Sequence, residues 1–295
     1  MARQDRLRLR LFFSPSSASD GGSTFGVEET DLMKRIFLTG ASSGIGLAVA
    51  RALSANGDEV WGTARKAGRI PTLPGLHRLT LDLLDRDSLG EIFHSAWREA
   101  GHFDVVINNA GSGYFGPAES LSSEELARHF QVLVFGQIEL LRLALEAMRR
   151  EEHGLVINVS SLASRLPVPY MAAYNAAKAA LAVYTMSIQL ELEKGNVRLV
   201  DLQPADINTG FNNAIAKTAT NDRRVNRAWQ SVDRNMKAAP PPELVARRVI
   251  KLIDQANPPA RVTVGDSFQS IIAPLIFRFL PQGVKLWGLR KYYGI

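Results

Sequence analysis

The architecture of this chain can be predicted outward from one segment, Lys34-Arg-Ile-Phe-Leu-Thr-Gly-Ala-Ser-Ser-Gly-Ile-Gly46. Its first residues, Arg35–Thr39, form a short apolar run, which predicts a buried β-strand. Glycines follow at positions 40, 44 and 46, and Gly44–Asn56 has the apolar spacing of a helix. Such glycines allow a tight turn, and the amides and dipole at the start of the helix attract an anion. The segment therefore predicts a strand–turn–helix unit that binds a dinucleotide pyrophosphate.

The rest of the chain repeats this alternation of short apolar runs with amphipathic stretches of helical length. It predicts an α/β, Rossmann-type, doubly wound parallel sheet of about seven strands with helices on both faces. The predicted strands are Arg35–Thr39, Glu59–Ala64, His77–Leu81, Asp104–Asn108, Gly154–Ser160, Arg198–Gln203 and Arg261–Val264. The predicted helices are Gly44–Asn56, Arg86–Glu99, Ser122–Arg150, Ala172–Glu193 and Pro242–Gln255.

Composition divides the chain into three parts. Residues 1–32 alternate Arg with Leu and then become rich in Ser and Gly, which predicts a disordered N-terminal extension. Met33 directly precedes the first predicted strand. It is therefore a candidate for the native start, with residues 1–32 added by translation from an upstream start codon. Residues 33–265 are predicted to be the catalytic domain, with a substrate loop at 211–241, and residues 266–295 an apolar and basic C-terminal extension that packs on the core or forms a lid.

The composition also excludes several kinds of site. The chain has no cysteine, so it has no disulfide, thiol nucleophile or thiolate metal ligand. Its five histidines lack the spacing of a metal motif, and no metal is assigned. Any redox chemistry would therefore require a bound organic cofactor.

Positive charge is concentrated toward the C-terminus. The formal net charge is +6, and from Lys217 onward fourteen basic residues face five acidic ones, 14 − 5 = +9. This balance is compatible with an anionic cofactor or substrate, with an anionic membrane surface or with a simple solvated face. No nucleic-acid-binding motif accompanies it, so no nucleic-acid partner is predicted.

Four more motifs follow the glycine turn in order. Asn108-Asn109-Ala110-Gly111 ends the fourth strand, and Ser161 follows the fifth. Tyr174-Asn-Ala-Ala-Lys178 lies on a predicted helix, and Pro204–Thr209 follows the sixth strand. Taken together, the five motifs resemble those of the short-chain dehydrogenase/reductase family, over about Lys34 to Val264. The resemblance implies an oxidoreductase that uses a nicotinamide cofactor.

The resemblance also implies roles for individual residues. Ser161, Tyr174 and Lys178 are the expected catalytic residues. The expected cofactor-binding residues are Gly40, Ser42, Ser43, Gly44, Ile45, Gly46, Arg65, Asp82, Leu83, Asn109, Ala110, Gly111, Tyr174, Lys178, Pro204, Ile207 and Thr209. A cytoplasmic homo-oligomer, paired through the helices 122–150 and 172–193, is expected as well.

The spacing of Tyr174 and Lys178 has a physical reason. Residues four apart lie on one face of a helix, so the ammonium is expected near the phenol and favours its ionised form. A free tyrosine titrates near ~10, which is too high for an efficient base at neutral pH. Ser161 can donate a hydrogen bond to the substrate oxygen.

Cofactor choice depends on the residues after the second strand. A carboxylate there would bind the ribose 2′-hydroxyl of NAD, but this chain has Gly62-Thr63-Ala64-Arg65-Lys66. A guanidinium at Arg65 suits the 2′-phosphate of NADP, so NADP(H) is predicted in preference to NAD.

Two positions depart from the family pattern. Leu133 stands where the family usually has an asparagine, and leucine cannot join a hydrogen-bond chain to Lys178. Gln137, one turn further on, is a candidate substitute. Ala205 replaces the glycine usual after Pro204. These departures leave open an alternative, an NADP-binding sensor or regulatory protein with impaired catalysis.

The C-terminal part suggests an apolar substrate. Residues 211–241 are expected to form a wall of the substrate cleft. Beyond the last strand, residues 271–277, 280–287 and 290–293 mix apolar, aromatic and cationic side chains. They could form a lid over a lipophilic alcohol or ketone, lie on a membrane surface, or pack on the core or a second subunit. The arrangement is similar to that of family members acting on retinoids, steroids or other apolar alcohols and ketones, so the resemblance implies a lipid-like substrate.

Overall fold

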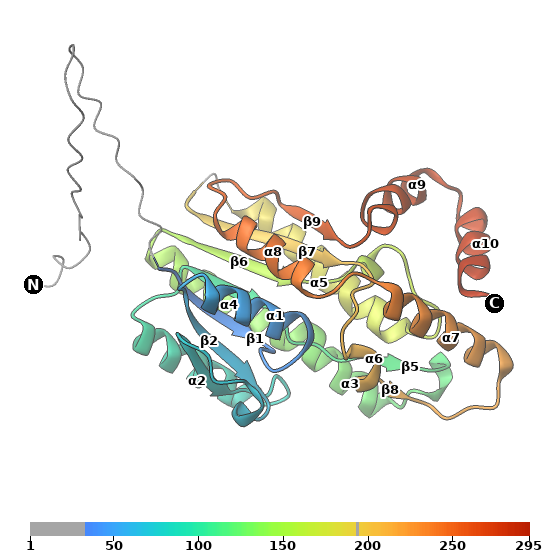
Figure 1. Ribbon diagram of the computed structural model, residues 1–295, viewed down its shortest axis with the longest axis horizontal. Coiled ribbons are helices and arrows are strands. Elements are labelled where there is room, and N and C mark those ends of the chain that lie inside the picture. Colours follow the sequence, from blue (N-terminus) through green and yellow to red (C-terminus); the bar gives the residue numbers. More distant parts are fainter. Residues whose placement is uncertain (1–32, 193–194) are drawn as a thin grey trace, which may run out of the picture. The chain divides into compact units, whose positions relative to one another are not determined.

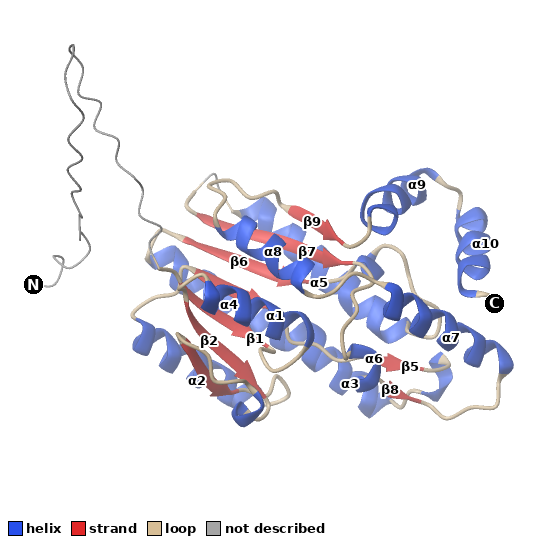
Figure 2. Ribbon diagram, viewed as in Figure 1, coloured by secondary structure: helices blue, strands red, loops and turns tan. Residues whose placement is uncertain are grey.

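The computed structural model describes residues 33–192 and 195–295, and the structural statements below concern those residues. They contain a parallel sheet of seven strands in the order β3-β2-β1-β4-β6-β7-β9, with helices on both faces (Figure 2). The strands are β1 (Arg35–Thr39), β2 (Glu59–Ala64), β3 (Leu76–Thr80), β4 (Val105–Asn108), β6 (Gly154–Val159), β7 (Val197–Pro204) and β9 (Arg261–Val264). The predicted doubly wound fold is confirmed, with strand ends shifted by at most one residue.

The order of the strands fixes where a ligand can bind. The chain runs outward from β1 to β2 and β3, then crosses back to β4 on the other side of β1. The connections above β1 and β4 therefore leave in opposite directions and open a crevice at the carboxyl ends of these strands. The predicted glycine turn after Thr39 lies at this point.

Two separate layers of helices cover the two faces of the sheet (Figure 1). Alternate residues of a strand face one layer or the other. Ile36 and Leu38 pack with α1 (Gly44–Ala55) and α8 (Glu243–Ile253). Phe37 points to the other face, where α2 (Arg86–Ala100), α4 (Gly136–Arg150) and α5 (Ala172–Glu191) cover the sheet. Both faces are apolar, which is why the strands lack the polar alternation of a half-exposed sheet.

The predicted single helix Ser122–Arg150 is three elements. Helix α3 (Ser123–Phe130) begins at a capping box made by Ser122 and Glu125. A π-helical turn, Gln131–Phe135, separates it from α4. A π turn is a single-turn change of hydrogen bonding inside a helix, and the residue types of the segment still favour a helix throughout, so the sequence pattern did not reveal the irregularity. The single-helix prediction was wrong on this point.

The predicted substrate loop 211–241 is largely helical. It contains the short α6 (Phe211–Ala214) and α7 (Arg223–Ala238), whose first turn is capped by the Asp222 carboxylate. Between these helices, β8 (Ala216–Lys217) pairs with β5 (Tyr114–Phe115) in a small second sheet. Helix α7 is polar except for one apolar side, and that sparse pattern explains why the sequence analysis took it for a loop.

The chain ends in two helices beyond β9, α9 (Ala273–Phe279) and α10 (Gln282–Tyr293). Tyr293 is buried and packs in a cluster with Val225, Ala228 and Val232 of α7. The shorter elements are the 3-10 turns Ala67–Arg69, Ala118–Ser120 and Leu162–Ser164 and the π turn Phe268–Ile272. The predictions for residues 1–32 and for the end of the helix at 193 lie outside the described residues.

Candidate active site

A cavity of about 1220 Å³ lies at the carboxyl ends of the strands. It brings together every residue that the sequence analysis predicted for catalysis or cofactor binding, although they come from well-separated parts of the chain. The predicted residues that line it are Gly40, Ser42, Ser43, Gly44, Ile45, Gly46, Arg65, Asp82, Leu83, Asn109, Ala110, Gly111, Ser161, Tyr174, Lys178, Pro204, Ile207 and Thr209.

The glycine turn is packed too closely for larger residues. A Cβ atom on Gly46 would lie 2.2 Å from the carbonyl oxygen of Gly40. Gly40 itself has φ +76°, and a Cβ there would lie 2.9 Å from the Cα of Ala110. An L side chain at either position would push the turn away from the neighbouring strand end, so the backbone can approach a ligand closely only with glycine here.

The segment after β4 is tied to the end of β1. The Thr39 hydroxyl oxygen accepts hydrogen bonds from the amides of Asn109 and Ala110, at 2.9 and 3.0 Å. The Asn109 side chain donates back to the Thr39 carbonyl at 2.9 Å. These bonds hold the two walls of the crevice at a fixed separation.

Helix α1 presents its N-terminus to the same crevice. Its N-cap, Ser43, has an extended backbone, and its side chain makes no capping hydrogen bond. No acidic residue occupies the first turn. The first amides of the helix therefore need an acceptor, and a phosphate group supplies one. These features fit the pyrophosphate of a nicotinamide dinucleotide.

Two guanidinium groups line the cavity next to the end of β2. Arg65 was predicted, and Arg69, at the end of the 3-10 turn that follows, was not. The residues Thr63–Lys66 include no acidic side chain. Arg69 follows Arg65 by four residues in the sequence. This spacing indicates a shared site only when the chain between them is known to form a turn.

Ser161 caps the 3-10 turn after β6, and its hydroxyl oxygen accepts the amide of Ala163 at 3.1 Å. This bond orients the hydroxyl and leaves its proton available. A hydrogen bond from Ser161 stabilises the Tyr174 phenolate and acts to lower its pKa.

Burial has the larger effect on Tyr174. It raises the pKa of the phenol above its ordinary value, and the nearby Asp206 carboxylate adds to the increase. The lowering expected from Lys178 is therefore not seen. The phenol consequently keeps its proton at neutral pH.

Lys178 is buried, with 4% of its surface exposed. Its Nζ donates to the carbonyl oxygen of Val159 at 2.7 Å. Burial lowers the pKa of this ammonium to about 8, and the Asp201 carboxylate opposes that change. Lys178 is thus held beside the last residue of β6, and it remains charged in neutral solution.

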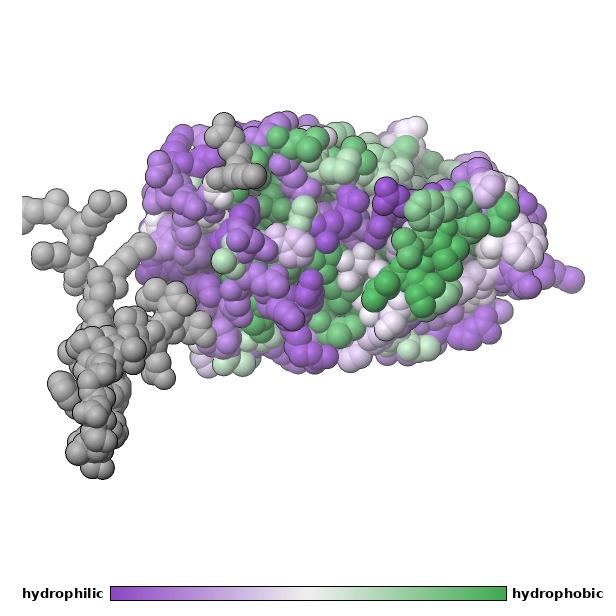
Figure 3. Space-filling model, turned by 90° about the horizontal axis from the view of Figure 1, so that it is seen from above, coloured by the Kyte–Doolittle hydropathy of each residue, from purple (hydrophilic) through white to green (hydrophobic). Residues whose placement is uncertain are grey.

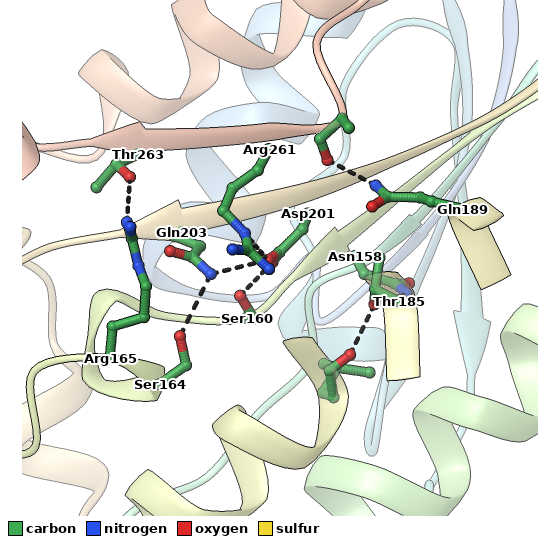
Figure 4. A network of polar contacts seen from close by, with 12 residues as sticks. Asn158, Ser160, Ser164, Arg165, Thr185, Gln189, Asp201, Gln203, Arg261 and Thr263 are labelled. Carbon is green, nitrogen blue, oxygen red and sulfur yellow. Dashed lines mark hydrogen bonds and ion pairs between the residues drawn. The ribbon is translucent and has the colours of Figure 1, made fainter. Parts of the chain in front are cut away.

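Asp201 is buried and belongs to a network of polar contacts (Figure 4). Its carboxylate accepts hydrogen bonds from Gln203 and Arg261, both at 2.8 Å, and from the Ser160 hydroxyl. The side chain of Asp201 is fully buried, so these donors compensate for its lost hydration. The network fixes a negative charge whose field acts on Lys178.

The other end of the cavity carries many apolar side chains beside polar ones such as Asn212, Asn235 and Gln269. It is formed by residues of the loop before α5, of α6 and of the C-terminal helices. These include Val168, Met171, Phe211, Ile215, Ile276, Phe277 and Leu289. The one cavity therefore has a polar end and an apolar end, with Tyr174 among the residues that line it.

Comparison with known proteins agrees with this geometry. A family model described as short chain dehydrogenase matches residues 34–220. The chain belongs to the short-chain dehydrogenase/reductase family. A 3-ketodihydrosphingosine reductase of Bacteroides thetaiotaomicron is 30% identical over 266 residues, covering 88% of this chain and 98% of the relative.

Solved structures of the family have the same fold. A short-chain dehydrogenase from Streptomyces avermitilis is 25% identical and superposes with a TM-score of 0.73, covering 89% of this chain and 95% of the other. An alcohol dehydrogenase from Thermococcus sibiricus, complexed with 5-hydroxy-NADP, is 26% identical with a TM-score of 0.64, covering 80% and 97%.

The family's usual asparagine position is apolar in this chain. Leu133 is fully buried and packs in a cluster with Ala177 and Tyr174. Gln137, the suggested substitute, donates its side-chain amide to the carbonyl oxygen of Ala110 and accepts from Asn108 through its backbone. Gln137 therefore supports the segment after β4, and its side-chain oxygen is buried without a hydrogen-bond partner among the described residues; its role in a replacement relay stays a prediction.

His129 is a residue of the site that sequence reasoning missed. It lines the cavity, is 7% exposed, and its ring centroid lies 6.4 Å from that of Tyr174. Its Nε2 is buried without a hydrogen-bond partner among the described residues. Burial, together with the charge of Lys178, lowers its pKa to about 4. The position four residues before Leu133 was a usable signal, since both lie on one helical face.

Proposed function

We propose that this chain is an NADP(H)-dependent oxidoreductase that moves a hydride between the nicotinamide and the carbinol or carbonyl carbon of an apolar, lipid-like alcohol or ketone. One observation carries the proposal. Ser161, Tyr174 and Lys178 line the same cavity as the glycine turn and Arg65, and that cavity continues into an apolar end.

The residues act together in the direction of carbonyl reduction. Reduced nicotinamide, when bound, supplies the hydride. Ser161 donates a hydrogen bond that orients the carbonyl oxygen, and Tyr174 donates its proton to that oxygen. Burial favours this role, because a phenol with a raised pKa is protonated at working pH. Lys178, still charged below a pH of about 8, stabilises the phenolate that remains.

A preference for NADP rests on the residues after β2. Arg65 and Arg69 both line the cavity, and guanidinium groups bind a phosphate through paired hydrogen bonds. The Thermococcus sibiricus structure holds 5-hydroxy-NADP, which supports the same choice here. We expect NADPH to bind more tightly than NADH.

The substrate class rests on the apolar end of the cavity. Aromatic and aliphatic side chains there suit a hydrocarbon chain better than a sugar or an amino acid. The relative from Bacteroides thetaiotaomicron is named for its reduction of 3-ketodihydrosphingosine, a long-chain ketone. A ketone of this kind is our first candidate substrate.

The test is NADPH oxidation by the purified chain with a series of ketones of increasing chain length, including 3-ketodihydrosphingosine. Tyr174→Phe is compared with Tyr184→Phe, a control on the same helix whose ring packs on the sheet side. We expect turnover that rises with chain length and disappears only in Tyr174→Phe. Equal loss in both variants, or no turnover with any ketone, would reject the proposal.

A second candidate, an NADP-binding sensor without efficient catalysis, is favoured by Leu133. This apolar side chain fills the position next to Ala177 where the family relay usually begins. Calorimetric titration with NADPH distinguishes the two functions. Tight binding together with no turnover on any carbonyl would favour the sensor.

We also expect the chain to form a homo-oligomer through α4 and α5. Helix α5 exposes Val183, Met186 and Leu190 at a helical spacing, and Leu190 is 85% exposed. Such a row on a solvent face is typical of a contact with a second subunit. Sedimentation equilibrium of the wild type and of Leu190→Asp tests this expectation.

A further inference from the structure

The C-terminal helices carry a large apolar surface that faces solvent. Figure 3 shows it as a continuous green area at the end of the molecule that carries α9 and α10. We call it the C-terminal face. Its exposed apolar side chains are Phe268, Ile271, Ile272, Leu275, Ile276, Phe279, Val284, Leu286, Trp287 and Tyr292.

The exposure of this face does not come from loose packing of the segment. Gln269 accepts the amide of Asp206 at 3.2 Å and donates to the Asp206 carboxylate at 2.7 Å. It also donates to the Tyr292 hydroxyl at 3.1 Å. Tyr293, on the opposite side of α10, is 8% exposed. The helices are therefore attached to the core by one side and present the other to solvent.

The charges on this face are mostly positive. Residues 266–295 contain four basic side chains and one acidic one, Asp266, whose carboxylate accepts the amides of Phe268 and Gln269. Arg278 lies 5.8 Å from the ring of Phe279, and Lys291 lies 5.3 Å from the ring of the exposed Trp287. Aromatic rings beside cations are typical of segments that lie at the boundary between lipid headgroups and acyl chains.

We propose that the C-terminal face docks the protein on the surface of an anionic lipid bilayer. Basic side chains complement anionic headgroups, and the apolar residues between them enter the boundary of the acyl chains. A second copy of the chain fits less well, because a two-fold contact would bring two patches of the same positive net charge together. No helix in the described part of the chain is long and apolar enough to cross a membrane.

The same helices form part of the cavity wall. Ile276, Phe277 and Leu289 line it from α9 and α10. A lipid substrate could thus pass from the bilayer to Tyr174 along apolar side chains. This consequence rests on the proposed function, whereas the docking itself does not.

The test is flotation of the full chain with vesicles of phosphatidylcholine, with or without phosphatidylglycerol, in the absence of cofactor. We expect binding only to the anionic vesicles, weakened about tenfold or more in Phe279→Ser/Trp287→Ser and in Arg278→Gln/Arg290→Gln. Arg247→Gln/Lys251→Gln on α8 removes the same charge elsewhere and should bind like wild type.

Three outcomes would overturn the proposal. The wild type could stay in solution with both kinds of vesicle, or all variants could float as well as the wild type. A lower molar mass for Phe279→Ser/Trp287→Ser by sedimentation would make the face a subunit interface. Reduction of a short, water-soluble ketone, measured in parallel, separates the two proposals, since docking without turnover refutes only the proposed function.

Discussion

The two ends of the cavity are built differently. At the cofactor end, backbone atoms of the turn at 40–46 meet the segment 109–111 at distances that leave no room for a side chain. At the substrate end, side chains from α6, α9 and α10 meet from distant parts of the chain. A surface made of backbone tolerates few replacements, whereas packed apolar side chains can be exchanged for others of similar volume. Adding even one methyl group at the cofactor end should therefore disturb the structure. The substrate end should instead respond to changes in the volume and shape of its side chains.

The largest effect is expected at Tyr174, where the two ends meet. Tyr174→Phe should lower kcat/KM by about a thousandfold, because it removes the proton donor but little volume. The affinity for NADPH should change little. Steady-state rates and calorimetry measure the two quantities, with Tyr184→Phe as control. Loss of cofactor affinity equal to the loss of rate would show that Tyr174 acts in binding instead.

A substitution at Gly46 tests the steric argument for the cofactor end. Gly46→Ala should destabilise the fold by about 2 to 3 kcal/mol and weaken NADPH binding, because its Cβ would lie 2.2 Å from a carbonyl oxygen. Gly90→Ala, in α2, meets no atom within 4 Å and should stabilise by about 0.5 to 1 kcal/mol. Urea unfolding measures both, and equal effects would refute the steric argument.

The pH dependence of stability tests the burial of His129, whose side chain lines the cavity. Its pKa is about 4 in the folded chain and 6.5 as a free side chain, so the unfolded chain binds the proton more tightly. Stability should therefore fall as the pH drops from 6.5 toward 4, and this group should account for about 2 kcal/mol at a pH of about 5.

His129→Leu should remove that part of the pH dependence, and His94→Leu, at an exposed position of α2, should retain it. Urea unfolding at about pH 7.5 and about pH 5 measures the difference. An unchanged dependence in His129→Leu would mean that the imidazole is hydrated or paired in solution.

The smallest effect is expected at Arg65. Arg65→Ala should weaken NADPH binding by about tenfold and leave NADH binding unchanged, because only NADPH carries the 2′-phosphate. Arg98→Ala, an exposed arginine of α2, is the matched control. If both cofactors bind more weakly to Arg65→Ala, then Arg65 contacts a group that they share, and Arg69 becomes the candidate for the 2′-phosphate.

Much of the fold and of the cofactor end could be predicted from local patterns. Strand β1 and the turn to α1 follow from an apolar run and three glycines, and both requirements act within a few residues. Helix α7 could not be predicted, because its apolar side packs against residues distant in the sequence, among them Phe115 and Tyr293. The apolar periodicity of a short segment cannot reveal contacts with distant parts of the chain.

The sequence by itself determined the doubly wound sheet, the glycine turn and the placement of Tyr174 and Lys178 one turn apart on a helix, because these features follow from local patterns of residue types and spacings. Only the tertiary structure decided that Gln137 supports Ala110, that His129 lies beside Tyr174 and that Arg69 joins Arg65. It also decided that α9 and α10 both contribute to the cavity wall and expose apolar side chains to solvent. These features depend on packing between segments that are distant in the sequence. Such packing determines which side chains are buried together after the sheet has formed.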